Sequence, residues 1–82
     1  MGHTFTFYYD PGHAWLEVST EEMRRVGVKP SQISSCSWKR KGRFYLEEDC
    51  DAGVFLRAYE AKHGHAPEIV ETELKHRSEI GG

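Results

Sequence analysis

Residues 4–9, Thr-Phe-Thr-Phe-Tyr-Tyr, constrain the fold more than any other segment of the chain. Successive side chains of a strand point to opposite faces, so Phe5, Phe7 and Tyr9 would share one face. A helix would scatter the same rings around its circumference, whereas aromatic residues are favoured in strands. We therefore expect a half-buried β-strand, which needs neighbouring strands and a layer that covers its apolar face.

A turn, a second strand and a helix are expected next. Residues 10–12, Asp-Pro-Gly, favour a tight turn, and apolar alternation resumes over residues 14–18. These features predict an antiparallel hairpin. Ser19 and Glu22 then have the spacing of a helix capping box. Gly27 can end this short helix in the left-handed conformation.

A second hairpin is expected from residues 33–39 and 43–48, and the length of its loop decides which side chains face the core. A loop of two residues pairs Trp38 with Tyr45. A loop of three residues ends in a glycine, where a left-handed residue is favoured, and pairs Trp38 with Phe44. The second alternative gives one continuous apolar face, and a slip of one residue would exchange the faces. We therefore expect the three-residue loop.

A second helix and a final strand complete the expected elements. Asp49 or Asp51 is expected to cap the helix, and Gly64 to end it. Residues 67–76 alternate like a strand, although a proline and several nearby glutamates would also suit a helix start. We expect an edge strand.

These elements predict one α+β domain over residues 1–82 in the order β-β-α-β-β-α-β, with two short helices on one face of an antiparallel sheet. Residues 1–3 and 78–82 are expected to be frayed. A chain this short has a thin core. We expect that core to consist of Phe5, Phe7, Leu16, Val18, Met23, Trp38, Phe44, Leu46, Phe55 and Tyr59.

Composition and the N-terminal segment favour a cytoplasmic protein. The two cysteines form no disulfide framework of the kind that small secreted domains use. No signal peptide or membrane-spanning run is visible. The net charge of −2 does not indicate a general nucleic-acid-binding protein.

No motif predicts catalysis, a metal or a cofactor. Cys36 is expected on the core face, where a thiol is inert, and Cys50 lies among carboxylates that raise its pKa. His63 and His65 could give two nitrogens to zinc or nickel, but histidines also complement the dipole at a helix end. We expect no enzyme.

Two charged segments are candidates for a binding surface. The first, called here the acidic run, is residues 47–51, with acidic candidates Glu47, Glu48 and Asp49. It could bind a hard cation or a basic partner, or it could simply cap a helix. The second, called here the basic tip, lies at the expected second hairpin and consists of Lys39, Arg40, Lys41 and Arg43. Basic residues flanked by aromatic ones suit phosphate contact and base stacking, but they also protect a hairpin from edge pairing.

Three segments together resemble a group of short proteins carried by phages, plasmids and other bacterial mobile elements. The segments are residues 10–18, 33–35 and 45–51, so the resemblance covers the first two-thirds of the chain and fades after Gly64. Some small mobile-element proteins are anti-CRISPR or similar anti-defence inhibitors, which occlude a host complex. The resemblance implies a protein-binding inhibitor of a nucleoprotein defence complex, and it assigns no functional residue.

The expected function is therefore a non-enzymatic inhibitor that uses the acidic run, the basic tip or both. The alternative is a small nucleic-acid-binding or regulatory protein that uses the basic tip. A metal-dependent or thiol enzyme is the third hypothesis.

Overall fold

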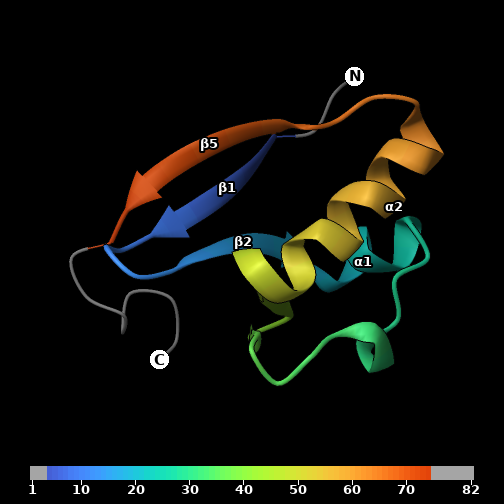
Figure 1. Cartoon of the computed structure of the whole chain (residues 1–82). Coiled ribbons are helices and arrows are strands. Elements are labelled where there is room, and N and C mark those ends of the chain that lie inside the picture. The colour runs from blue at the N-terminus through green and yellow to red at the C-terminus, as the bar shows by residue number, and fades with distance from the viewer. Residues whose placement is uncertain (1–3, 75–82) are drawn as a thin grey trace.

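The computed structural model describes residues 4–74, which form a five-stranded sheet and two α-helices. The strands are β1 (Thr4–Tyr9), β2 (Ala14–Ser19), β3 (Trp38–Arg40), β4 (Arg43–Glu47) and β5 (Glu68–Glu73). The helices are α1 (Thr20–Arg25) and α2 (Gly53–His63). Figure 1 shows both helices with β1, β2 and β5 of this sheet. Two short turns are added to the expected order, a 3₁₀ turn η1 (Pro30–Gln32) and a π-helical turn η2 (Glu48–Ala52). The α+β class is confirmed.

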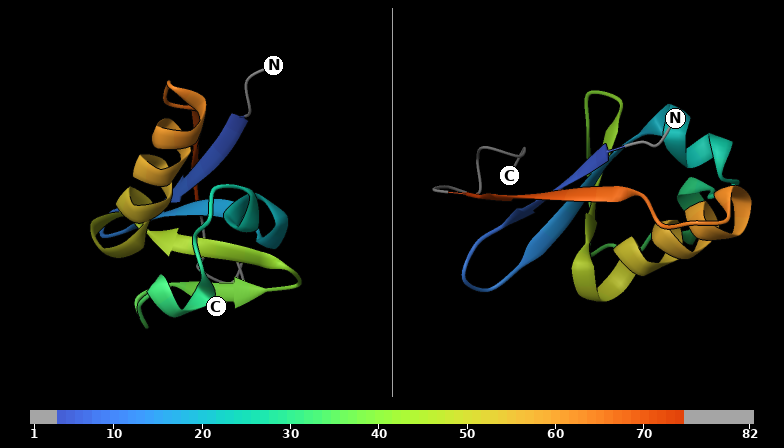
Figure 2. Two further views of the ribbon diagram at one scale, coloured as in Figure 1. Left: turned by 90° about the vertical axis from the view of Figure 1, so that its right-hand side faces the viewer. Right: turned by 90° about the horizontal axis from the view of Figure 1, so that it is seen from above.

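The sheet has the strand order β3-β4-β2-β1-β5, and it is mixed rather than antiparallel. β5 pairs with β1 in parallel, whereas the other neighbours are antiparallel. The expected antiparallel sheet is confirmed for β1 to β4, and β5 is the exception. Because α2 carries the chain from β4 across the sheet to its far edge, β5 runs in the direction of β4. Figure 2 shows the twist of the sheet, with β5 and the β3–β4 hairpin crossing steeply.

Both helices pack on one face of the sheet. The core of this face contains most of the expected residues, together with Val28 and Ala52. Phe5 forms edge-on ring contacts with Phe55 at 5.1 Å and Tyr59 at 5.7 Å, which join β1 to α2. Among the other expected residues, Phe7 is only partly buried against this core.

The second hairpin has a two-residue loop, so the expected three-residue loop is wrong. Trp38 pairs with Tyr45, and Phe44 pairs with the residue after Trp38. Lys41 and Gly42 both have positive φ, 50° and 77°. Two positive φ angles are typical of a type I′ turn, whose twist matches that of the flanking strands. Trp38 therefore lies on the face opposite the helices.

Residues 33–37 do not continue β3, although the sequence predicts a strand over residues 33–39. Hydrogen bonds hold Ser34 and Ser37 to Asp51 instead, and this draws the segment away from the sheet. Cys36 is exposed rather than on the core face. The Ser34 amide therefore donates to the side chain of Asp51 and not to a neighbouring strand.

The ends of α1 follow the sequence prediction. Ser19 Oγ accepts the Glu22 amide at 3.1 Å. Gly27 has a φ of 79°, and the Val28 amide donates to the Met23 carbonyl at 2.9 Å. This pattern is a Schellman motif, which satisfies carbonyls that the helix end would leave unpaired. Gly64, with a φ of 80°, ends α2 in the same conformation.

The face of the sheet opposite the helices, called here the open face, carries a second apolar cluster. Trp15, Tyr45 and Leu74 are buried there, and Tyr8 and Trp38 pack against them. The sequence prediction of one apolar face missed this cluster because alternate residues of β2 and β4 are large on both sides.

The final strand is confirmed over residues 68–73, and it lies at an edge of the sheet. Residues 75–76 of that prediction, and the expected frayed residues 1–3 and 78–82, lie outside the described residues. No helix in the described part of the chain is long and apolar enough to span a membrane.

Candidate functional site

The acidic run divides into solvent-facing and structural carboxylates. Glu48 and Asp49 are exposed on η2. Glu47 is half-buried at the end of β4, and its carboxylate accepts the Asp49 amide as the cap of η2. Asp51 is buried, with 3% of its surface exposed. Only Glu48 and Asp49 of this run are therefore available to a partner without disturbing a local hydrogen bond.

Asp51 ties η2 to the segment before β3 and caps no α-helix. Its carboxylate accepts the Ser34 amide at 3.1 Å, the Ser34 hydroxyl at 2.8 Å and the Ser37 hydroxyl. Burial acts to raise the pKa of Asp51, but the hydrogen bonds from Ser37 and Ser34 outweigh it and lower the pKa. Asp51 therefore stays ionised at neutral pH.

The expected cap by Asp49 or Asp51 is wrong because η2 precedes α2 and takes its cap from Glu47. Ser37 Oγ also accepts the Glu47 amide at 3.0 Å. Ser37 thus joins both ends of η2, which fixes the backbone that presents Glu48 and Asp49.

Three distant segments bring carboxylates to one depression, which we call the acidic hollow. Asp10 from the β1–β2 turn, Glu48 from η2 and Glu71 from β5 line a space of about 270 Å³. Asp10 Oδ1 accepts the amides of Gly12 at 2.9 Å and His13 at 2.8 Å, which fixes the turn. His13 also lines the hollow, with Nδ1 4.0 Å from Asp10 Oδ1.

Sequence reasoning found Glu48 but missed Asp10 and Glu71. No local signal joins these residues, because Glu71 comes to line this hollow only through the pairing of β5 with β1. The pairing of Glu71 with Phe7 places Glu71 on the helix face of the sheet.

The basic tip does not form one surface. Lys39 pairs with Phe44 and lies on the helix face, with Nζ 5.4 Å from the centre of the Phe44 ring. Arg40 and Arg43 pair with each other on the open face. The Gly42 carbonyl accepts the amide and the hydroxyl of Thr20, both at 2.9 Å, which anchors the loop to α1. The structure therefore separates Lys39 from the rest of the basic tip.

The remaining basic residues surround a second depression, which we call the basic hollow. Arg40, Lys41, Arg43 and Tyr45 line a space of about 470 Å³. Within it, Arg43 Nη1 lies 3.2 Å from Glu17, and the Tyr45 hydroxyl donates to Glu17 at 2.9 Å. Burial raises the pKa of Tyr45, and this hydrogen bond raises it further. Arg43 and Tyr45 are therefore partly engaged within the chain, although the Arg43 side chain is still exposed. Arg40 and Lys41 are also exposed.

The cysteines and histidines form no metal site in the described part of the chain, where no three His, Cys, Asp or Glu residues are grouped suitably. Hydrogen bonding with Cys36 is the main cause that raises the pKa of Cys50 to about 11, ahead of nearby Glu47. The thiolate that a nucleophile or ligand needs is thus suppressed. His63 and His65 contact the Tyr59 ring, at 4.3 and 6.1 Å between ring centres.

Comparison with known proteins identifies no relative: no protein-family profile, curated protein or solved structure matches this chain.

Proposed function

We propose that this chain is a non-enzymatic binding protein of a phage or mobile element, which inhibits a bacterial defence complex in the host cytoplasm by occluding it, as an anti-CRISPR protein does. The observation that carries the proposal is the acidic hollow, in which Asp10, Glu48 and Glu71 converge from separate segments. Like charges that folding brings together repel one another, and a cationic partner relieves that repulsion.

A nucleoprotein complex offers such a partner surface, because its nucleic-acid channel is positively charged. Complementary charge steers association and fixes the orientation of the partners. The acidic hollow is also preorganised: Asp51 and Ser37 hold η2, and Asp10 holds its own turn. A rigid surface loses less entropy on binding.

Charge reversal within the hollow tests the proposal. We expect the double variant Glu48→Lys, Glu71→Lys to lose the proteins that the parent captures from a bacterial lysate, as measured by quantitative mass spectrometry. Glu47 is left unchanged because its carboxylate caps η2. Capture by the parent should also weaken as salt rises from about 0.05 to about 0.5 M, because salt screens exposed charges.

The control is a single charge reversal at the other end of β2. Glu21 is exposed on α1 and pairs with Arg25 at 2.7 Å. We expect Glu21→Lys to capture the same proteins as the parent. Equal capture by the parent and by a folded Glu48→Lys, Glu71→Lys variant would show that the acidic hollow is not the binding surface.

A second candidate function, nucleic-acid binding, is favoured by the basic hollow. Arg40 and Lys41 lie beside Tyr45 on the open face, and cations beside an aromatic ring suit phosphate contact. We expect this function to require Arg40 and Lys41, and to be independent of Lys39, which lies on the opposite face. Salt-dependent retention on immobilised single-stranded DNA and RNA, lost in Arg40→Glu, Lys41→Glu but kept in Lys39→Glu, would support it.

A further inference from the structure

β5 presents an open strand edge. All six of its residues are exposed, and it is the last strand of the sheet within the described residues. The Leu74 amide donates to the Tyr9 carbonyl at 2.7 Å, so Leu74 turns its backbone groups toward β1. Because alternate residues of a parallel strand bond to the same neighbour, Ile69, Glu71 and Glu73 turn their amides and carbonyls away from β1.

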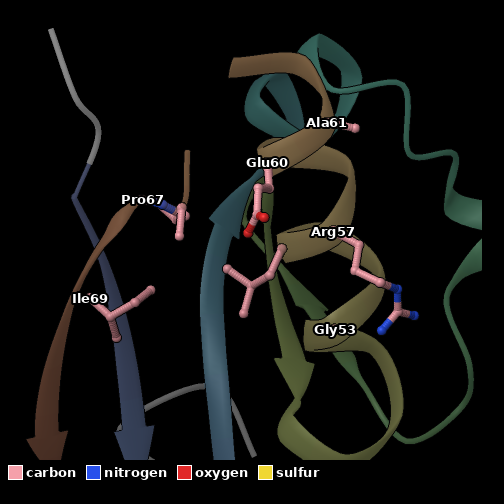
Figure 3. Close-up of a pocket in the computed structure, with 8 residues that line it drawn as sticks. Gly53, Arg57, Glu60, Ala61, Pro67 and Ile69 are labelled. Atoms are coloured by element: carbon pink, nitrogen blue, oxygen red, sulfur yellow. The ribbon is translucent and has the colours of Figure 1, made fainter. Parts of the chain in front are cut away.

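A groove accompanies the start of this edge. It lies between α2 and β5, has a volume of about 540 Å³ and is lined by apolar side chains that include Leu56, Ala61 and Ile69 (Figure 3). Arg57 and Glu60 are its charged residues. The guanidinium of Arg57 packs over Gly53, since a methyl group added there would lie 3.0 Å from Nη1.

The charge of β5 is entirely negative. Glu68, Glu71 and Glu73 are exposed, and the strand has no basic residue. Glu71 and Glu73 share the helix face with Ile69, because these three residues pair with Phe7, Tyr9 and Phe5 of β1. The groove residues Arg57 and Glu60 balance each other, so the edge keeps a charge of −3 from its three glutamates.

This charge decides which occupant fits the edge. In a second copy of the chain, β5 would bring three more glutamates against these three, and like charges on neighbouring strands destabilise their pairing. An extended segment with lysine or arginine opposite the glutamates of β5 would instead place a cation beside each of them. The charge pattern thus discourages self-pairing while leaving the main-chain edge open to a basic strand.

We propose that β5 and its groove are a docking site for an extended basic segment of a protein partner, which adds to the sheet beyond β5. The inference rests on the proposed function, which it deepens by naming the element that the partner contributes. Main-chain hydrogen bonds form with Ile69, Glu71 and Glu73. An apolar side chain of the added strand lies beside Ile69 in the groove, and cations lie beside Glu71 and Glu73.

Synthetic peptides test the inference directly. The probes are two fluorescein-labelled hexapeptides, Lys-Leu-Val-Lys-Thr-Lys and the same residues in reverse order, which cover parallel and antiparallel addition. We expect the fluorescence anisotropy of one of these peptides to rise when the protein is added. The same peptide should shift the amide resonances of residues 68–73 of the protein. A version with glutamate in place of lysine, and versions N-methylated at alternate amides, should each bind at least about tenfold more weakly, because they lose charge complementarity or main-chain hydrogen bonds.

Two variants at one position separate main-chain docking from charge. Glu71→Pro and Glu71→Ala remove the same carboxylate, but only the proline removes the outward amide, a substitution that edge strands tolerate. We expect Glu71→Pro to bind the peptide about tenfold more weakly than Glu71→Ala. The N-methylated peptides give the same comparison on the parent protein, should the proline variant fail to fold.

Equal binding of the N-methylated and unmodified peptides, or amide shifts confined to residues 47–49, would overturn strand addition. Absence of binding by both basic peptides would overturn it as well. These results would leave the proposed function standing if the Glu48→Lys, Glu71→Lys variant still lost its captured proteins. The proposed function itself would be contradicted if the Glu48→Lys, Glu71→Lys variant captured the same proteins as the parent.

Discussion

Asp51 shows how a single buried carboxylate can redirect the chain around it. Its partners Ser34 and Ser37 lie 17 and 14 residues earlier, so no local spacing indicates the contact. Sequence reasoning placed Asp51 at a helix cap because acidic residues are common there. The exposure of Glu48 and Asp49, in contrast, could be predicted from the density of charge in this segment.

The lowered pKa of Asp51 predicts a pH dependence of stability. The carboxyl group has its ordinary pKa of 3.8 in the unfolded chain and a lower one in the folded protein. Its contribution is therefore complete above about pH 5 and is lost as the pH falls through the folded pKa. We expect Asp51→Asn to reduce the slope of unfolding free energy against pH below about pH 5. Urea denaturation at several pH values measures this, with Asp49→Asn as the control for removing an exposed charge; equal slopes in all three proteins would contradict it.

The two tryptophans should contribute unequally to stability. Trp15 is 2% exposed within the open-face cluster, whereas Trp38 is only partly buried against it. We expect Trp15→Ala to cost about 3–5 kcal/mol, the range for a buried large aromatic residue, and Trp38→Ala to cost clearly less. Chemical denaturation of both variants measures the difference. A larger loss in Trp38→Ala would favour the three-residue loop, which puts Trp38 in the helix-face core.

At the scale of elements, the parts that depend on local chemistry could be predicted and those that depend on distant partners could not. Ser19, Gly27 and Gly64 mark helix ends by their own conformational preferences. The strand at residues 68–73 follows from alternation. Its direction does not, because only packing on α2 decides which edge of the sheet it joins.

The prediction of the register of the β3–β4 hairpin was wrong for a related reason. Apolar side chains lie on both faces of β4, so the rule of one apolar face chose the wrong loop. The residues of the loop did not indicate the two-residue turn either, since lysine is an uncommon residue at positive φ. The side chain of Lys41 is exposed in this position, with a φ of 50°.

A substitution in the loop tests the register. Asparagine adopts positive φ more readily than lysine and is favoured before glycine in a type I′ turn. We expect Lys41→Asn to stabilise the protein by about 0.5–1 kcal/mol, within the range known for relieving backbone strain at a single turn position. Urea denaturation measures it, and Lys39→Asn, in the strand, is the control. A loss of stability in Lys41→Asn would contradict the two-residue loop.

For the whole molecule, β4 separates two surfaces of opposite charge. The basic hollow lies at its start and η2 at its end, about 13 Å apart for a five-residue strand. The acidic hollow could not be predicted from the sequence, because Glu71 lines the same depression as Glu48 only through the pairing of β5 with β1. The acidic run supplies only Glu48, one of the three carboxylates that line this hollow.

The glutamates of β5 should keep the molecule monomeric. We expect the triple variant Glu68→Thr, Glu71→Thr, Glu73→Thr to associate with itself in a concentration-dependent manner, because it leaves an open edge rich in strand-forming residues without charge. Sedimentation velocity measures the association. A control with the same loss of charge on helices, Glu21→Gln, Glu22→Gln, Glu60→Gln, should remain like the parent, and a monomeric triple threonine variant would contradict this role.

The parallel pairing of β1 with β5 also predicts the order in which the strands pair during folding. Thr4 meets Glu68, 64 positions later, whereas β1–β2 and β3–β4 close through short turns. Because long loops close slowly, we expect the hairpins to form first and β5 to join last. Until it arrives, β1 is itself an open edge that presents Phe5 and Phe7. The strand that is added last is also the one with every residue exposed. We therefore expect its amides to exchange with solvent faster than those of β2 and β4, through opening of this edge alone.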